Sequence, residues 1–358
     1  MKFPALSTRG AVAIGAATLA TAAAATVAVV STASASPDAP RRFVLGVSNT
    51  LVGNGWREEM ICSIKAQARA SGRVSRVVVV NENAAGAADQ IGHIRRLISA
   101  GVNAIIINPV DRDALNPIIE QAAARGIVVV AVDQAVSTPK AYVATNNQVA
   151  YGRIGMAWLA KKLKGRGRVV EMRGIAGVPA DTDRHNGVRQ ALRRFKQLKV
   201  AKQTFTGWVY ATGGKQMLDL LNSGVKFNGV WTSGIDYTVV NAFRTAKKKF
   251  VPVVGSDNNA FLGQLLKLRQ RGLVGAAVTN PATIGGVGAS IALKVLTGKK
   301  VPRRVTLKPE VWDNTTKAGL RKIRRFYSQK RAPNYSSQLF VKPWTTYTEK
   351  QLVNCQGP

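Results

Sequence analysis

Eight short apolar runs recur along this chain, and each is followed by a stretch whose apolar residues repeat with helical spacing. The runs lie in the segments FVLGVS, VSRVVVV, AIIIN, IVVVAVD, RVVEMRG, FNGVWTSG, FVPVVGSD and LVGAAVTN. Their apolar residues are nearly continuous and do not alternate with polar ones, which indicates strands buried on both faces. Such strands pair in parallel under covering helices, so the chain is predicted to be an α/β protein.

The alternation of strands and helices passes through the chain twice. Two successive units of similar size predict two doubly wound lobes within the 358 residues. The part after Lys299 is poorer in periodicity and rich in proline, lysine and aromatic residues, and no element is assigned to it. The expected helices are 56–71, 87–100, 114–125, 150–163, 186–197, 238–247, 262–271 and 285–296.

The N-terminus has the layout of a secretory signal peptide. Lys2 and Arg9 precede an Ala- and Val-rich stretch over 11–30, and ASA at 33–35 offers the small residues of a cleavage site. We predict a signal peptide over 1–35 and a soluble, exported protein in the periplasm or at the extracellular face of the envelope. An uncleaved membrane anchor is the alternative, because the apolar stretch is long. No later stretch reaches the ~18 unbroken apolar residues of a spanning helix.

Two cysteines, Cys62 and Cys355, lie near opposite ends of the exported chain. An oxidising compartment permits a disulfide between them. The alternative is a buried free thiol at Cys62 and an exposed one at Cys355, because sequence alone does not show whether their Cα atoms approach closely enough.

The chain is strongly basic, with 52 Lys and Arg against 18 Asp and Glu and a net charge of +34. Removing 1–35 takes away only Lys2 and Arg9 and leaves +32. Such a charge suits nucleic acid, an anionic membrane or an anionic cell wall. The basic residues are spread along the chain without interleaved stacking aromatics, so we predict a solvated basic surface and no nucleic-acid partner. An envelope-associated binder of an anionic polymer is the alternative function.

Polar residues follow one predicted strand after another, at the edge where open parallel α/β sheets bind ligands. Asn and Asp are also common in turns and at helix starts, so each residue alone carries little weight. Their recurrence in both halves of the chain predicts a cleft for a small, neutral ligand rich in hydroxyl groups. The residues are Asn54, Trp56, Asn108, Asp133, Gln134, Asp257, Asn258, Thr279 and Asn280.

Signatures of catalysis and of cofactor binding are thin in this sequence. His93 and His185 are the only histidines, and with two distant cysteines they make no recognisable zinc site. The chain has no G-x-x-x-x-G-K-[ST] phosphate loop and no G-x-S-x-G elbow, and GGVG at 285–288 lacks the dinucleotide-binding spacing. We predict no catalytic residue, no metal, no cofactor and no enzyme, while a carboxylate-pair hydrolase stays open on spacing alone.

The order of several motifs resembles the ribose-type periplasmic sugar-binding proteins, the substrate-binding components of ABC importers. The motifs are GVSNTLVGNGWREEM, INPVDRDAL, VVVAVDQ, ATNN, VVEMRGIAGVPADTDRHNG, VVGSDNN and AVTNPATIGGVGASIALKVLTGKK. The resemblance implies the type I periplasmic binding protein fold, with two Rossmann-like lobes joined by a three-stranded hinge. It further implies a monomeric receptor that closes on a sugar or polyol and delivers it to a membrane permease.

On this resemblance the chain crosses the hinge near 144–147, near 279–280 and after Pro302. Each lobe is therefore discontinuous in sequence. The lobes are expected to comprise 43–145 plus 280–306, and 146–279 plus part of the basic tail 307–358.

The resemblance also implies the main contacts of the ligand site. Trp56 aligns with an aromatic residue that lies on a sugar face. The alternative for Trp56 is a core residue at the start of a helix. Trp208 suits the aromatic wall of the second lobe. Asp133 and Asp257 align with acceptors of hydrogen bonds from paired hydroxyls, one in each lobe.

Three further polar residues are expected at the site. Asn54 lies in the same loop as Trp56, and Arg57 is suited to bind two hydroxyls. Asn108 aligns with the family's Asn-Pro strand end, where an amide offers both a donor and an acceptor. A surface position for Arg57 and a plain turn at Asn108 are the alternatives.

This chain departs from the family pattern at several positions. Gln134 stands where the family commonly has an arginine, and Thr182 stands at the usual ligand-binding arginine. Arg184 aligns with a second arginine that the family often carries, so it is an expected ligand contact, with helix capping as the alternative. Asp236 is the nearest candidate for a missing Asn-Asp pair, and Thr279 replaces a glutamine at the last hinge strand. These changes argue against simply naming ribose as the ligand. The fold also serves sugar-responsive repressors, but those begin with a DNA-reading helix-turn-helix where this chain has its predicted signal peptide.

Overall fold

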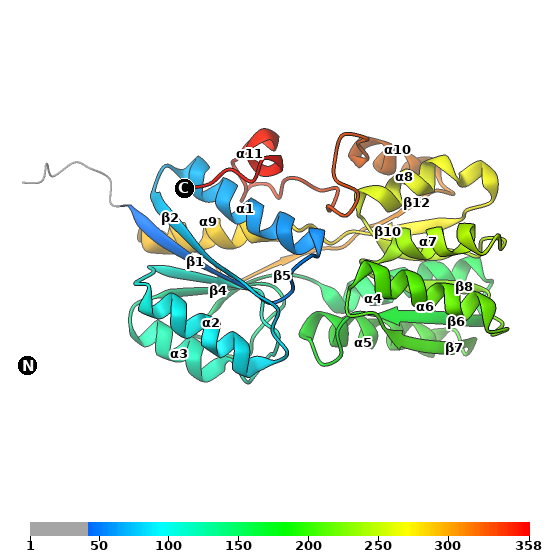
Figure 1. Cartoon of the computed structure of the whole chain (residues 1–358), viewed down its shortest axis with the longest axis horizontal. Coiled ribbons are helices and arrows are strands. Elements are labelled where there is room, and N and C mark those ends of the chain that lie inside the picture. Colours follow the sequence, from blue (N-terminus) through cyan, green and yellow to red (C-terminus); the bar gives the residue numbers. More distant parts are fainter. Residues whose placement is uncertain (1–41) are drawn as a thin grey trace, which may run out of the picture. The chain divides into compact units, whose positions relative to one another are not determined.

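The computed structural model describes residues 42–358, so the predicted signal peptide lies outside the described residues. Two six-stranded sheets organise the described chain, and helices cover both faces of each sheet (Figure 1). We call each sheet with its helices a lobe.

The first sheet is parallel throughout and has the strand order β11-β5-β4-β3-β1-β2. Helices α1 (Gly55–Ser71) and α9 (Ile284–Leu296) cover one face, and α2 (Ala87–Ser99) and α3 (Asn116–Ala124) cover the other. The strands are β1 (Phe43–Asn49), β2 (Val74–Asn81), β3 (Ala104–Ile107), β4 (Val128–Asp133), β5 (Tyr142–Asn146) and β11 (Arg304–Leu307).

The second sheet has the order β12-β10-β9-β8-β6-β7, and β12 alone runs antiparallel to its neighbour. Its strands are β6 (Arg166–Arg173), β7 (Gln197–Phe205), β8 (Gly229–Thr232), β9 (Val253–Ser256), β10 (Gly275–Val278) and β12 (Val311–Asp313). Its helices are α4 (Gln148–Lys162) and α5 (Pro179–Arg194) on one face, and α6 (Tyr210–Asn222), α7 (Asp236–Thr245), α8 (Asn259–Lys267) and α10 (Lys317–Phe326) on the other, with a short 3-10 turn at Arg269–Arg271.

The unbroken apolar runs of the strands follow from burial on both faces. In β3, Ile106 packs in the core under α1 and α9, whereas Ile105 and Ile107 pack in the core under α2 and α3. Successive side chains of a strand point to opposite faces, so a sheet covered on both sides needs an apolar residue at every position. This confirms the fold class expected from the sequence.

Three connections pass between the two lobes: β5 to α4, β10 to α9, and β11 to β12. Hydrogen bonds hold them together as a hinge, since Thr279 N donates to Glu310 O at 3.0 Å and Asn146 Nδ2 donates to Thr279 O at 2.9 Å. The lobe boundaries expected above stay a prediction.

The chain after α10 passes between the lobes a fourth time. Residues 327–358, which we call the C-terminal strap, start beside α8 and end with α11 (Glu349–Val353) packed on α1 (Figure 1). A disulfide between Cys62 on α1 and Cys355 joins the end of the strap to the first lobe, with the Cα atoms 4.5 Å apart.

Several elements differ from the sequence-based expectation. The helix expected over 186–197 begins earlier, at Pro179, and ends at Arg194, and the residues that follow form β7. This strand lies at the sheet edge and its apolar residues are mixed with exposed Lys and Gln, so it lacks the signal of the buried strands. Helix α8 begins at Asn259 because the Asn258 side chain caps it, accepting from Phe261 N at 2.9 Å. Helices α6, α10 and α11 were not expected.

Candidate ligand-binding cleft

A cavity lies at the carboxyl ends of the strands of both sheets. Open α/β sheets bind their ligands at this edge. Residues of both lobes, the hinge and the strap line it: Leu51, Asn54, Trp56, Arg57, Asp133, Arg184, Trp208, Tyr210, Ser233, Gly234, Ser256, Asp257, Asn258, Asn280, Asn334 and Ser336.

Most of the ligand residues expected from the sequence meet in this wall. They come from segments far apart in the chain, and their roles as ligand contacts remain a prediction. The residues are Asn54, Trp56, Arg57, Asp133, Arg184, Trp208 and Asp257.

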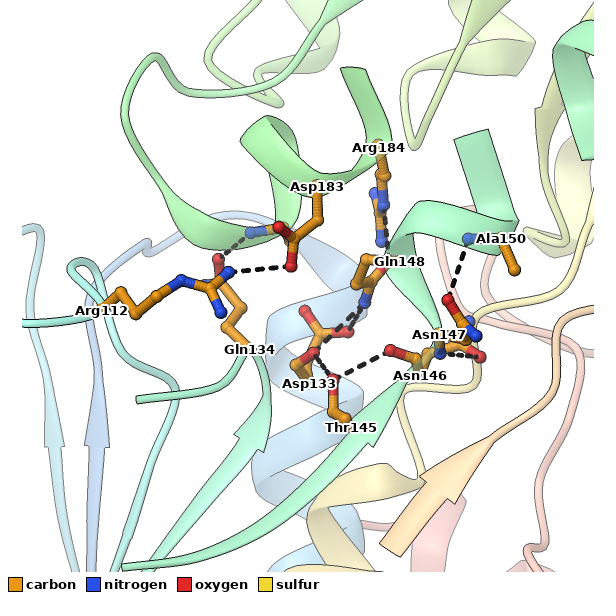
Figure 2. A network of polar contacts seen from close by, with 11 residues as sticks. Arg112, Asp133, Gln134, Thr145, Asn146, Asn147, Gln148, Ala150, Asp183 and Arg184 are labelled. Atoms are coloured by element: carbon orange, nitrogen blue, oxygen red, sulfur yellow. Dashed lines mark hydrogen bonds and ion pairs between the residues drawn. The ribbon is translucent and has the colours of Figure 1, made fainter. Parts of the chain in front are cut away.

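Asp133 offers an acceptor to the cavity. It ends β4 with a backbone φ of +64°, and its Oδ1 accepts from Gln148 Nε2 at 2.8 Å and from Asn280 Nδ2 at 3.2 Å. Its backbone oxygen accepts from Thr145 Oγ1 at 2.6 Å, as Figure 2 shows. Oδ2 receives no hydrogen bond from residues 42–358, which leaves it as an acceptor for a ligand hydroxyl.

Two buried arginines bring positive charge to the cavity. Arg184 Nε donates to Gln148 Oε1 at 2.8 Å, and its guanidinium lies 4.4 Å from the ring centre of Tyr151. Burial lowers the pKa of Arg57 to about 10, with Asp133 opposing this shift and Arg184 adding to it. Arg57 therefore stays protonated at neutral pH and offers donors only.

Two tryptophans supply the apolar part of the wall. Trp56, in the first turn of α1, donates from Nε1 to Asn280 O at 2.7 Å. Trp208 has a backbone φ of +55°, and a Cβ at Gly174 would overlap its indole ring. Its Nε1 is buried with no hydrogen-bond partner among the described residues. Aromatic faces beside carboxylates and amides suit a ligand with both C–H and hydroxyl surfaces.

Asp257 lies on the opposite lobe and is held by the strap. Its Oδ1 accepts from Asn280 N at 2.9 Å, while Ser336 Oγ, Ser337 Oγ and Gln338 Nε2 approach its Oδ2 at 3.2, 3.3 and 3.4 Å. Burial raises the pKa of this carboxyl, and the donors around it act against that shift.

Asn280 connects the two aspartates. Its side chain donates to Asp133 and accepts from Asn146 Nδ2 at 2.9 Å, while its backbone nitrogen donates to Asp257 and its backbone oxygen accepts from Trp56. A hinge residue thus fixes the carboxylates of both lobes in one arrangement.

Two expected ligand residues, Asn108 and Gln134, are not among the residues that line the cavity. Asn108 Oδ1 accepts from Gln134 Nε2 at 2.6 Å, and its Nδ2 lies 3.5 Å from Met60 Sδ. Gln134 Oε1 in turn accepts from Ala180 N, on the second lobe, at 2.8 Å. These amides have protein partners in this structure, and their roles as ligand contacts stay a prediction.

Asp236 and Thr279 also lie outside the cavity wall. Asp236 accepts from Gly234 N at 3.1 Å and from Asn258 Nδ2, and burial raises its pKa to about 7. Thr279 Oγ1 accepts from Glu310 N at 2.9 Å within the hinge. Both hold neighbouring segments of the protein together, and their roles as ligand contacts stay a prediction.

Some lining residues were not assigned from the sequence. Asn258 and Asn280 were noted only as polar residues at strand ends, although their neighbours Asp257 and Thr279 were chosen. Tyr210 lies in a helix that was not expected. Asn334 and Ser336 had no usable signal, because the strap lacks the periodicity that places elements in a fold.

Contacts across the cleft hold the lobes against each other (Figure 2). Arg112, after β3, pairs with Asp183 on α5 at 2.8 Å. Asn54 Nδ2 donates to Trp208 O at 3.0 Å. With the Gln134–Ala180 hydrogen bond, these contacts place the described structure in a closed arrangement.

The histidines lie apart from the cavity. His185 Nδ1 pairs with Glu171 Oε1 at 2.8 Å, and His93 Nε2 lies 3.5 Å from Glu82. Over residues 42–358 there is no group of three His, Cys, Asp or Glu side chains arranged to hold a metal ion. No helix in this range is both long and apolar enough to cross a bilayer.

Comparison with known proteins decides the family. Residues 45–300 match the periplasmic binding protein domain. The chain belongs to the periplasmic binding protein family. This periplasmic binding protein is 26% identical over 270 residues to the ribose import binding protein of Bacillus subtilis, across 74% of this chain and 86% of that relative.

Further relatives and structures agree with this assignment. The protein is 28% identical over 218 residues to a xylitol-binding protein of Mycolicibacterium smegmatis, across 59% of this chain and 61% of that relative. An ABC transporter solute binding protein from Thermobispora bispora superposes with a TM-score of 0.73 at 26% identity, covering 82% of this chain and 90% of that one. These matches confirm the ribose-type resemblance and the two-lobe fold, and they make the chain a binding protein and not an enzyme.

Proposed function

We propose that this periplasmic binding protein is an exported, monomeric receptor that closes on a small neutral sugar or polyol and delivers it to an ABC permease. The observation that carries the proposal is the pair Asp133 and Asp257, one from each lobe, joined through Asn280 at a cavity that Trp56 and Trp208 also line. Carboxylates accept from hydroxyls, and the rings cover apolar sugar faces.

The names of the relatives support the ligand class. The matches include a ribose import binding protein and a xylitol-binding protein. A pentose and a pentitol share a run of neighbouring hydroxyls and carry no charge. The cavity here holds two aspartates and two arginines, which balance in formal charge, so a neutral ligand suits it better than an ion.

Export and delivery are part of the same proposal. The sequence over 1–35 supports export through a signal peptide, and the contacts across the cleft support a closed form that a permease would recognise. We expect a Kd of about 1 µM or tighter, near −8 kcal/mol.

A thermal-shift screen of residues 36–358 tests the proposal. The panel contains pentoses, hexoses, furanoses and polyols, each at 50 mM and 500 mM NaCl, because a ligand that binds only the folded state raises the unfolding midpoint. A shift with one sugar or polyol at both salt concentrations supports the receptor. If no member of the panel shifts the midpoint, the proposed function is overturned.

A second candidate function follows from the basic surface. Helix α10 exposes Lys317, Arg321, Lys322, Arg324 and Arg325, and the chain after residue 35 carries +32. An envelope polymer rich in phosphate or carboxylate would bind such a face, with an affinity that falls steeply as salt rises. Binding of polyphosphate at 50 mM NaCl that disappears at 500 mM NaCl would favour this role.

A further inference from the structure

We propose that Asn334, on the C-terminal strap, contacts the ligand and helps to select which sugar or polyol the cleft accepts. The inference rests on the proposed receptor function and concerns a residue beyond the matched range 45–300. It adds a wall to the site that comes from neither sheet nor the hinge.

Asn334 lies against the start of α1. It lines the cavity together with Asn54 and Trp56. A Cβ at Gly55 would overlap Cγ, Nδ2 and Oδ1 of Asn334, so the whole amide group occupies the space that a glycine leaves there. The Asn334 amide, on the strap, thus contacts the first lobe at the edge of the cavity.

The backbone around Asn334 is held on both sides. Ala260 N donates to Pro333 O and Asn259 N donates to Tyr335 O, both at 2.8 Å, which fixes the strap to the start of α8. Two residues after Asn334, Ser336 N donates to Glu59 Oε2 on α1 at 2.6 Å. Hydrogen bonds therefore join the strap to both lobes around Asn334, and they fix the position of the backbone that carries the Asn334 side chain.

The Asn334 amide is free to bind a ligand. It is half-buried, and no hydrogen bond joins it to another residue of the described chain 42–358. Burying such a group without a partner costs free energy, which a ligand hydroxyl would offset by accepting from Nδ2 or donating to Oδ1. The amide offers both a donor and an acceptor, which match the donor and acceptor of a hydroxyl.

Asn334 differs in this respect from the central residues of the site. Asp257 and Asn280 each accept or donate several protein hydrogen bonds, so changing them also alters the scaffold. Removing the Asn334 amide leaves the described hydrogen bonds in place. Its loss should therefore alter which ligand binds without dismantling the cleft.

The test compares Asn334→Leu with Asn354→Leu, a substitution of the same type at an exposed position of the same strap that is outside the cavity wall. Calorimetric titration of both variants and the wild type uses the sugar or polyol with the largest thermal shift and its deoxy analogues. We expect Asn334→Leu to raise the Kd of the best ligand at least tenfold and to raise the Kd of one deoxy analogue much less. A site that hydrogen-bonds a ligand hydroxyl binds the analogue without that hydroxyl much more weakly. Removing the Asn334 amide should therefore reduce the difference in Kd between the ligand and its deoxy analogue. Asn354→Leu should leave every Kd unchanged.

Two outcomes overturn the inference and differ in meaning. If the wild type binds and Asn334→Leu keeps the same affinities in the same order, the role of Asn334 is refuted while the receptor function stands. If the wild type binds no sugar or polyol, the receptor function fails and this inference fails with it. Should Asn334→Leu lower the midpoint of the ligand-free protein, Asn334→Asp, which keeps the side-chain size and removes the donor, provides the same comparison.

Discussion

Asp133 combines a rare backbone conformation with a partly open carboxylate. Its φ of +64° lies in the left-handed region, which Asp and Asn tolerate better than other L-residues. Residues held in this region gather at functional sites when the surrounding structure fixes them. Here Gln148, Asn280 and Thr145 fix Asp133 through hydrogen bonds, and its Oδ2 remains available to a ligand.

We predict that Asp133→Asn weakens ligand binding more than tenfold, which is a loss above about 1.4 kcal/mol. Asparagine keeps the size and suits the same φ, so the change removes charge and acceptor strength without adding backbone strain. Isothermal titration against the best ligand measures the effect. Asp219→Asn, at an exposed position on α6, is the control and should bind like the wild type. Equal affinity in both variants would refute the role of Asp133.

Gly174 is required by the aromatic wall. We predict that Gly174→Ala displaces Trp208, because the added Cβ would overlap the indole ring, and that it weakens binding at least tenfold. Tryptophan fluorescence of the ligand-free protein should change as well. Gly214→Ala on α6 is the matched control, since its Cβ would meet Thr238 Cβ at an ordinary 3.4 Å. Unchanged fluorescence and affinity in Gly174→Ala would show that the ring does not depend on this glycine.

At the scale of elements, helix starts organise the second side of the cavity. Asp236 opens α7 and accepts from Asn258, which caps α8, so one buried carboxyl links the first turns of two helices. The sequence predicted both helices, but it began them at 238 and 262. Apolar spacing locates the middle of a helix, whereas caps depend on side-chain hydrogen bonds that spacing does not reveal.

Asp236 should make stability depend on pH. Burial raises its pKa from the usual 3.8 to about 7, so between these values the folded state holds a proton that the unfolded state has released. The stability linked to this proton is present below about pH 4 and is lost as the pH rises through about 7. We predict that the unfolding midpoint of Asp236→Asn, relative to wild type, increases from pH 5 to pH 8. A difference that does not change with pH would contradict the shift, and Asp219→Asn should show no such trend.

At the scale of the whole molecule, the strap adds a connection that three hinge strands do not supply. It fastens to α8, to Asp257 and to Glu59, and it ends at the Cys62–Cys355 disulfide. Cys62 and Cys355 are 293 residues apart in sequence, so the bond closes nearly the whole described chain into one loop.

We predict that reduction of this disulfide lowers the free energy of unfolding, typically by about 2–4 kcal/mol for such a bond. The bond restricts the unfolded chain, and a long loop gains most from that restriction. Thermal unfolding with and without dithiothreitol measures the effect. The double variant Cys62→Ser/Cys355→Ser is the control and should unfold at the same low midpoint in both buffers. A wild-type midpoint that dithiothreitol does not move, under conditions where free-thiol assay shows full reduction, would contradict the prediction.

The sequence by itself determined the α/β fold and the edge of the sheets where a ligand would bind. Those features follow from local patterns: apolar residues at every strand position and polar residues where the strands end. Only the tertiary structure decided which of these polar residues face the cavity. Asp133 and Asp257 line it, while Asn108 and Asp236 are not part of its wall and form hydrogen bonds with other residues of the protein. The strap contributes Asn334 and Ser336 through contacts with residues remote in sequence, which no local pattern encodes.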